Sequence, residues 1–458
     1  MEFILAFILT WCFLCALAVF APDEARKPLQ AFIAIAFFTA LVLVATHISN
    51  VERLIATTGG MLYVFKTIIL LRLTHAEIAS FNPLGLVLYM TVWPGMDTKP
   101  FAVRVNTNET GDRFSKGAIF FMCGFLLTLF ISISLPTLPP YATPWLGLIA
   151  IMSMLHFGYS EMLTTFIRLA GFDVQPLFRD PLNATSLVDF WSKRWNLAFV
   201  EMDKILFLKP LRKELSASQA VFAIFLISGI LHELAISYPA FTNWGTPFLY
   251  FVIQGAALSV ETKFLKPLLQ NVFLGRAWTY FCILAPLPLL FTSGFQNEFI
   301  IPLFQTAHSF VMSKPLHDWL SLALWCAAAG NFVTICAGSQ VPFRLNWKDE
   351  FANLTPFTRK IIWTYYAYTG ATIVTWGTVT ILLHEQLLNG EKTALIFAVI
   401  IGIFWSARVL IDIFSFGHKG WPAGADMRIG HALLFFLFCA LAATYTTVVA
   451  LNWTTLIS

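Results

Sequence analysis

The sequence predicts an all-α polytopic membrane protein with about eleven to thirteen transmembrane helices. Two observations support this class. First, 58% of the 458 residues are apolar and only 12% are charged, whereas soluble domains carry about 25% charged residues. Second, apolar runs of spanning length recur along the chain between charged residues, prolines and glycines. So much apolar surface requires a bilayer as its solvent.

The apolar runs define the predicted spans in chain order. Most approach the roughly 20 residues that a helix needs to cross a bilayer. The runs at 60–72 and 298–312 are shorter and suit tilted, re-entrant or half-spanning segments. The full set lies near residues 3–21, 30–47, 60–72, 117–135, 144–169, 217–237, 245–262, 276–293, 298–312, 317–339, 360–384, 393–413 and 429–451.

Three hydrophilic stretches, 73–116, 171–216 and 338–360, interrupt this pattern. The second carries seven Lys or Arg residues, which favours the cytoplasmic side by the positive-inside rule. The third resembles a linker, so we expect one helical domain over 1–340 and additional membrane helices of unknown role over 341–458. The net charge of +4 does not indicate nucleic-acid binding.

The second stretch contains the segment NATSLVDFWSKRWNLAF. Ser186 and Asp189 have the spacing of a capping box, which predicts a helix that begins at Leu187. Along that helix apolar and aromatic residues recur at i, i+3, i+4 and i+7. Asp189 and Lys193 form an i, i+4 pair in the favourable order. The pattern therefore predicts one amphipathic helix through residue 198.

This amphipathic helix has two interpretations. As an interfacial helix, it would place its aromatic rings at the level of the lipid headgroups and its basic residues in water, which explains most of the pattern. As part of a functional site, it would use Lys193 and Arg194 to bind an anionic ligand while Asn196 points into the helix bundle. The residues alone leave both interpretations open.

The run over 217–237 carries His232 and Glu233 side by side in SGILHELAISY. Ionisable residues inside a membrane helix are costly, and they usually face a polar cavity and carry function. Ser228 and Gly229 precede His232 by four and three residues, so their small size lets a second helix or a substrate approach the imidazole. A histidine suits general-base catalysis on a hydroxyl because its pKa lies near neutrality. The alternative is a structural histidine with both nitrogens paired.

Other ionisable residues give weaker signals. His156 and His431 lie within or near apolar runs but lack an adjacent carboxylate. Asp412 is a further intramembrane acid, and Arg408 is its expected partner at i, i+4. The remaining histidines lie at predicted helix ends or in loops, where interfacial or solvated positions are usual.

Two segments together resemble the wax synthase-like branch of the membrane-bound O-acyltransferase superfamily. They are DFWSKRWN at 189–196 and SGILHEL at 228–234, which follow the family pattern F-W-x-x-R-W-N and then S-G-x-x-H-E. WPGMDTKPF at 93–101 is similar to an upstream segment of bacterial members. The resemblance covers about residues 30–310. The matching positions are Phe190, Trp191, Arg194, Trp195, Asn196, Ser228, Gly229, His232 and Glu233.

The resemblance implies membrane helices arranged around a substrate tunnel, with acyl-CoA as co-substrate and no resident cofactor or metal. A lipophilic alcohol would be the acceptor, with membrane lipids around the protein in a bacterial inner membrane or the endoplasmic reticulum. His232 maps onto the proposed catalytic base and Asn196 onto its polar partner. The remaining positions would contact substrate: Trp191, Lys193, Arg194, Trp195, Ser228 and Glu233.

Two other functions stay open. One is a transporter or lipid-handling protein in which His232 and Glu233 line a proton or substrate path, because transporters place such residues near the bilayer midplane. The other is an O-acyltransferase for a polysaccharide, a protein or a specialised metabolite. Plant wax synthases largely end near the equivalent of residue 310, and about 150 residues follow here.

Overall fold

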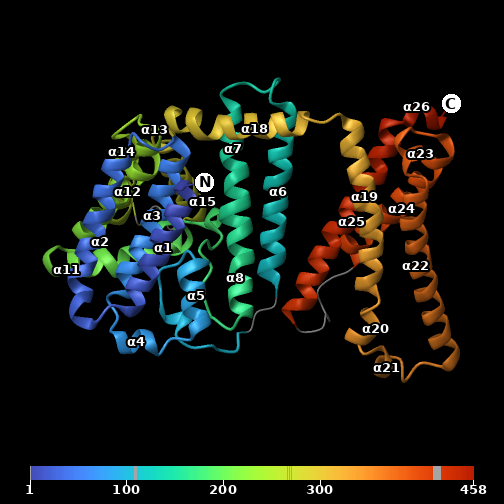
Figure 1. Ribbon diagram of the computed structural model, residues 1–458, viewed down its shortest axis with the longest axis horizontal. Helices are drawn as coiled ribbons and strands as arrows, with labels where there is room; N and C mark the ends of the chain where they lie inside the picture. Colours follow the sequence, from blue (N-terminus) through green and yellow to red (C-terminus); the bar gives the residue numbers. More distant parts are fainter. Residues whose placement is uncertain are drawn as a thin grey trace. The chain divides into compact units, whose positions relative to one another are not determined.

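A computed structural model describes residues 2–107, 111–265, 267, 269, 271–415 and 424–457. Every regular element in these residues is helical (Figure 1). Among them, 11 helices are long and apolar enough to cross a bilayer. The protein is therefore a multi-pass integral membrane protein, as the sequence predicts. Two compact units divide the chain: residues 1–109 with 116–308 form unit 1, and residues 110–115 with 309–458 form unit 2.

Unit 1 begins with three long helices, and polar residues set where its helices start. Ser49 and Glu52 form a capping box at the start of α3, and Ser216 and Gln219 form one at α12. Its main helices are α1 (Glu2–Phe20), α2 (Asp23–Val44), α3 (Asn50–Leu70), α5 (Pro83–Thr91), α6 (Asp112–Ser134), α7 (Ala142–Met152), α8 (Ser160–Leu169), α12 (Ala217–His232), α14 (Thr246–Val260) and α15 (Val272–Leu284).

Shorter elements connect these helices in unit 1. They are α4 (His75–Ala79), η1 (Lys99–Phe101), η3 (Pro181–Asn183), α9 (Leu187–Asp189), α10 (Leu197–Asp203), α11 (Lys209–Glu214), α13 (Tyr238–Ala240), α16 (Leu287–Leu290) and α17 (Ser293–Phe295). Within the described residues, unit 1 has six further elements that are π-helical turns: η2 (Ser153–Tyr159), η4 (Phe190–Arg194), η5 (Lys204–Leu208), η6 (Glu233–Ser237), η7 (Glu261–Leu265) and η9 (Gln296–Ile300). Such turns are rare and are frequently found at functional sites.

The short apolar runs take two different forms. The run at 60–72 falls mainly within α3, which is long enough to span the bilayer. The run at 298–312 becomes η9 and α18 (Ile301–Met312), and α18 crosses the ends of α6 and α7 (Figure 1). Gly147 of α7 permits this crossing, because a Cβ there would lie 2.4 Å from the Phe304 ring. Nδ1 of His308 donates a hydrogen bond to the Ser132 carbonyl at 2.7 Å.

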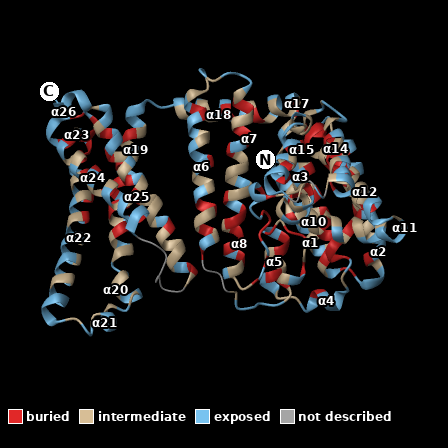
Figure 2. Ribbon diagram, turned by 180° about the vertical axis from the view of Figure 1, so that it is seen from behind, coloured by how far each residue is buried: buried red, intermediate tan, exposed pale blue. Residues whose placement is uncertain are grey.

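Unit 2 is a bundle of four long helices: α19 (Leu316–Gly338), α22 (Pro356–Leu382), α24 (Lys392–Ser415) and α25 (Ala425–Leu451). Short helices accompany them: α20 (Val341–Arg344), α21 (Trp347–Glu350), α23 (His384–Leu388) and α26 (Trp453–Ile457). Figure 2 shows α22 as mostly exposed and intermediate. Exposed apolar side chains of this kind face lipid in a membrane protein.

A buried polar cluster joins the four long helices of unit 2. The Asn331 amide donates to the Tyr445 hydroxyl at 3.1 Å and accepts from the Trp405 indole at 3.2 Å. The Tyr445 hydroxyl also lies 2.6 Å from the Thr380 hydroxyl. Each helix therefore contributes one side chain to a network that specifies how the helices pack.

The predicted pair between Asp412 and Arg408 is confirmed. Nη1 of Arg408 lies 2.9 Å from Oδ1 of Asp412, whose side chain is almost fully buried. Nε2 of His431 lies 3.2 Å from the same oxygen. Sequence reasoning missed His431 as a partner because it lies on a different helix, α25.

We predict that Tyr445→Phe destabilises unit 2, because the Asn331 and Thr380 side chains lose a buried partner. The expected loss is about 0.6–2 kcal/mol in the free energy of unfolding, measured by denaturant titration in detergent micelles. Tyr368→Phe on the exposed face of α22 is the matched control. Equal stability of the two variants would show that the cluster contributes nothing.

Candidate active site

His232 is the last residue of α12, where the helix passes into the π-turn η6. Its Nδ1 lies 2.7 Å from the carbonyl oxygen of Ser228. A carbonyl only accepts hydrogen bonds, so Nδ1 carries the proton and Nε2 of the neutral ring holds the lone pair. No side chain in the described residues forms a hydrogen bond with Nε2. The local helix therefore orients a basic nitrogen.

Two phenylalanines flank the imidazole. The Phe251 ring of α14 lies 4.2 Å from it, centroid to centroid, and the Phe199 ring of α10 lies 5.6 Å away. Trp191 in turn lies 6.0 Å from Phe251. Through these rings, the structure links the two family-like segments, which are well separated in sequence, around His232.

Asn196 lies directly before α10 with a left-handed backbone, φ 42°. Asparagine is among the few residues that adopt this conformation readily. Its Oδ1 accepts the Phe199 N–H at 3.4 Å and so caps α10. The two N–H groups of its amide form no side-chain hydrogen bond with the described residues. Asn196 thus positions the helix that carries Phe199 to His232 and keeps two donors available.

The predicted continuous helix through 198 is wrong in its second half. The Ser186 cap is confirmed, since its hydroxyl accepts the Asp189 N–H at 3.0 Å. After α9, the π-turn η4 follows, and the chain then becomes extended at Trp195. Because a π-turn aligns residues five apart, Asp189 pairs with Arg194 at 2.6 Å. The predicted Asp189–Lys193 pair is therefore wrong.

The basic residues of this segment have different surroundings. Arg194 also donates to the carbonyls of Arg179 and Asp180, each at 3.3 Å, so it holds the loop before η3. Lys193 is exposed. A role of either residue toward an anionic substrate stays a prediction.

The two tryptophans of the segment are packed differently. The indole N–H of Trp191 donates to Oε1 of Gln254 at 3.2 Å. Gln254 is fully buried and donates to the Cys282 carbonyl at 2.7 Å. Trp195 stacks between Phe190, at 5.3 Å, and His156, at 6.1 Å. Contact of either indole with substrate stays a prediction.

The small residues before His232 serve helix packing. A Cβ on Gly229 would lie 2.8 Å from the Phe248 ring, so α14 occupies this space. The sequence suggested that the small Gly229 lets either a second helix or a substrate approach His232. In the structure, the second helix α14 packs against Gly229. Ser228 is buried and supplies the carbonyl that orients His232.

Glu233 binds the start of the neighbouring helix. Its Oε1 accepts the Phe248 N–H at 2.9 Å in the first turn of α14, where a negative charge is favourable. Oε2 is buried without a partner in the described residues. Its position beside His232 therefore ties α14, and with it Phe251, to the histidine.

Two further carboxylates, which the sequence did not reveal, also accept backbone N–H groups of another segment. Glu261 accepts the N–H groups of Leu187 and Val188 at 2.8 and 3.1 Å and thereby anchors α9. Glu201 of α10 accepts those of Met96 and Asp97 at 2.8 and 3.0 Å. For Glu261, a lone acidic residue at the end of the apolar run 245–262 was the available signal.

Lys66 binds the same WPGMD turn from α3. Its Nζ donates to the carbonyls of Tyr89 and Gly95, both at 2.8 Å, and lies 3.6 Å from the centroid of the Tyr89 ring. The side chain is 1% exposed. Together with Glu201, it fixes the family-like segment WPGMD against α10, the helix that Asn196 caps.

Burial raises the pKa of two carboxyls on α10, which lies outside the spanning helices. It raises the pKa of Glu201, although the Met96 and Asp97 N–H groups oppose this effect. It raises the pKa of Asp203 to about 8. Oδ1 of Asp203 is buried and has no partner in the described residues. The α10 segment therefore holds a carboxyl that is protonated near neutral pH.

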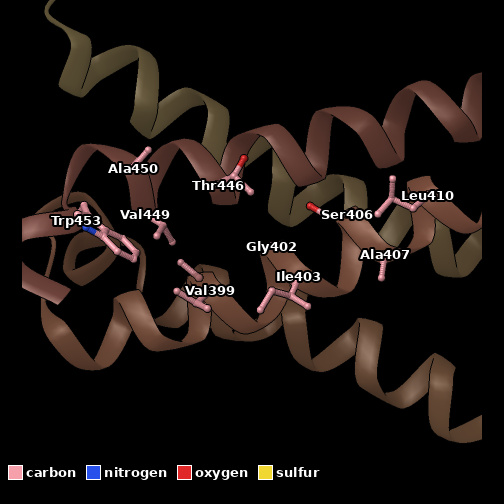
Figure 3. A pocket seen from close by; sticks show the side chains of 11 residues that line it. Val399, Gly402, Ile403, Ser406, Ala407, Leu410, Thr446, Val449, Ala450 and Trp453 are labelled. Atoms are coloured by element: carbon pink, nitrogen blue, oxygen red, sulfur yellow. The ribbon is translucent and has the colours of Figure 1, made fainter. Parts of the chain in front are cut away.

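A groove of about 700 Å³ lies between α24, α25 and α26 in unit 2 (Figure 3). Small residues such as Gly402 and Ala407 line it, together with Val399 and Trp453. Its only hydroxyls belong to Ser406 and Thr446. This lining contains no group that would act as a general base near neutral pH, so the groove is not a candidate for proton-transfer chemistry.

Part of this region matches a known protein family. Residues 174–253, which contain residues 186–198 (the loop helix) and His232, match the family model described as "Membrane bound O-acyl transferase family". Over these residues the chain is similar to that family. This confirms the resemblance that the two motifs suggest.

Relatives of two kinds are similar to parts of this chain. The "Probable long-chain-alcohol O-fatty-acyltransferase 6" of Arabidopsis thaliana is 36% identical over 25% of this chain and 36% of its own length. The "Long-chain-alcohol O-fatty-acyltransferase" of Simmondsia chinensis is 33% identical over 23% and 33%. The "Probable alginate O-acetylase AlgI" of Pseudomonas fluorescens is 24% identical over 52% and 54%. The chain spans about a third of the length of these plant relatives.

We predict that Glu201→Ala loosens the WPGMD turn. Charge-assisted hydrogen bonds contribute about 1.5–3 kcal/mol each, so the Met96 and Asp97 amides should exchange with deuterium about 10–100-fold faster in a mass-spectrometric measurement. Glu214→Ala, at an exposed position, is the control. Unchanged exchange in the Glu201 variant would show that the turn does not depend on this carboxylate.

We also predict a pH dependence from Asp203. Between about pH 4 and pH 8 its carboxyl is protonated in the folded chain and ionised in the unfolded chain. The folded state then binds the extra proton, so the free energy of unfolding falls as pH rises across this window. Asp203→Asn should flatten that slope and be more stable than wild type at pH 8. Identical slopes, with Asp349→Asn as the exposed control, would contradict this.

Proposed function

We propose that the protein transfers an acyl group from acyl-CoA to the hydroxyl of a lipophilic alcohol, with His232 as general base. The observation that carries the proposal is the orientation of His232: Nδ1 donates to the Ser228 carbonyl, which leaves the basic Nε2 available. This is the arrangement that proton removal from a hydroxyl requires.

The reaction follows simple acyl-transfer chemistry. Nε2 removes the proton of the acceptor hydroxyl while the oxygen attacks the thioester carbonyl carbon. A carbon–oxygen bond forms, the carbon–sulfur bond breaks, and the CoA sulfur leaves, finally as the thiol after it takes up the proton. The two N–H groups of Asn196 are suited to stabilise the negative charge that develops on the carbonyl oxygen.

The apolar surroundings support a lipophilic acceptor. Phe199 and Phe251 flank the imidazole, and Phe225 lies 6.0 Å from Trp191. Such walls favour alkyl chains and exclude water, which would otherwise hydrolyse the thioester. The plant relatives named as long-chain-alcohol acyltransferases support the same acceptor class.

The test uses the purified chain in lipid nanodiscs with radiolabelled acyl-CoA and a panel of alcohols that includes a long-chain alcohol, a polyol and a polysaccharide. His232→Ala should lower the rate of ester formation about 10²–10⁴-fold, and Asn196→Ala should lower it mainly through kcat. His317→Gln at an exposed position is the control and should keep full activity.

Several results would contradict the proposal. Full activity of a folded His232→Ala variant would remove the histidine from the chemistry. Esterification of the polysaccharide in preference to the long-chain alcohol would assign the acceptor to the class of the alginate O-acetylase relative. Proton-coupled flux without release of CoA would favour the transporter alternative.

A further inference from the structure

A second pocket in unit 1, of about 300 Å³, has aromatic walls and a charged rim. Phe157 and Phe178 form part of the wall, with ring centroids 5.9 Å apart. Lys116 of α6 and Asp180 form an ion pair at the pocket, and their side chains are 42% and 54% exposed. Both partners are therefore accessible to a ligand. The volume is at the small end of the range for ligand pockets, about 300–1,000 Å³.

Backbone interactions fix the residues around this pocket. Asp180 has a left-handed backbone, φ 45°, which costs energy in a residue other than glycine. Arg194 holds it there by donating to its carbonyl at 3.3 Å, and the Asn183 N–H donates to the same carbonyl at 2.9 Å. On the other side, a Cβ on Gly117 would lie 2.7 Å from the Gly158 carbonyl, so the two helices there are in close contact.

The charges and rings select one kind of ligand. Lys116 offers an ammonium to a phosphate, while the Asp180 carboxylate accepts from a cation. The faces of Phe157 and Phe178 also favour a cation.

When a phosphate takes over the Lys116 ammonium, Asp180 loses its N–H donor. A primary ammonium then supplies N–H groups to Asp180 and to the Asn183 amide oxygen, whereas a quaternary ammonium has none. Glu161 adds a second carboxylate to the lining, which also favours a cation. A ligand that matches the pocket therefore carries a phosphate joined to a primary ammonium.

The position of Lys116 in the membrane indicates which molecule supplies the phosphate and the ammonium. Lys116 is the fifth residue of the spanning helix α6, about 6 Å from the helix start, and lysines at this depth direct their ammonium toward the headgroup region. We propose that this pocket binds the headgroup of an ethanolamine phospholipid. The proposal is independent of the acyl-transfer reaction.

A ligand in this pocket would contact rings that pack against the DFWSKRWN segment. The Phe178 and Phe157 rings lie 5.2 and 6.3 Å from Trp195, and Trp195 directly precedes Asn196. The bound lipid therefore packs against rings that support the loop helix. It acts as a structural ligand of this segment.

The test measures lipid binding to the full chain by native mass spectrometry in detergent. Phosphatidylethanolamine, phosphatidylcholine and phosphatidylglycerol with identical acyl chains are compared, and soluble phosphoethanolamine is the fourth arm. Phosphatidylethanolamine should bind at least about tenfold more tightly than the other two lipids. Lys116→Met and Asp180→Asn should each remove this preference, while Lys360→Met and Asp349→Asn at exposed positions of unit 2 should keep it.

Asn183→Ala, at an exposed position of the rim, keeps the test decisive if the charge variants fail to fold. It should reduce the preference for phosphatidylethanolamine over phosphatidylcholine about threefold. Equal binding of all three lipids to wild type would overturn the proposal, as would an unchanged preference in folded Lys116 and Asp180 variants. Soluble phosphoethanolamine that binds as tightly as the lipid would overturn the assignment to a membrane lipid.

Discussion

A carboxylate that binds the free N–H groups of another segment is the interaction on which unit 1 depends. Glu233 binds the start of α14, Glu261 the start of α9, and Glu201 the WPGMD turn. In a bilayer, a helix end or irregular turn is tolerated only when protein groups satisfy its backbone. The carboxylates meet this requirement, and their negative charge suits helix N-termini. Glu233 also fixes α14, which carries Phe251 to His232.

The sequence alone predicts the membrane class and His232 as the candidate base, whose catalytic role stays a prediction. Composition and the spacing of apolar runs are enough to predict the membrane class, because a bilayer requires apolar segments of spanning length. An ionisable pair inside a spanning helix is enough for the second. The role of Glu233 was not predictable, because its partner Phe248 lies on α14 and only the packing of α12 against α14 brings the two together.

The loop helix shows why the remainder was not predictable. The pattern from Ser186 onward suited a regular helix, and a period of 3.6 placed Lys193 opposite Asp189. A single π-turn shifts that phase, so that Arg194 takes the position instead. Asn196 then adopts a left-handed backbone and starts a new helix. Apolar periodicity contains no signal for one added residue per turn, and tertiary contacts such as Arg194 with Asp180 decide the outcome.

In the proposed reaction, the acyl donor and the acceptor meet at the Nε2 atom of His232. A cryo-electron microscopy structure of the full chain with a non-hydrolysable acyl-CoA analogue tests this claim most directly. We predict that the carbonyl analogue lies against the Asn196 amide, with space for a hydroxyl within hydrogen-bond reach, about 2.6–3.2 Å, of Nε2. An analogue bound with its acyl–sulfur junction away from both residues would contradict it.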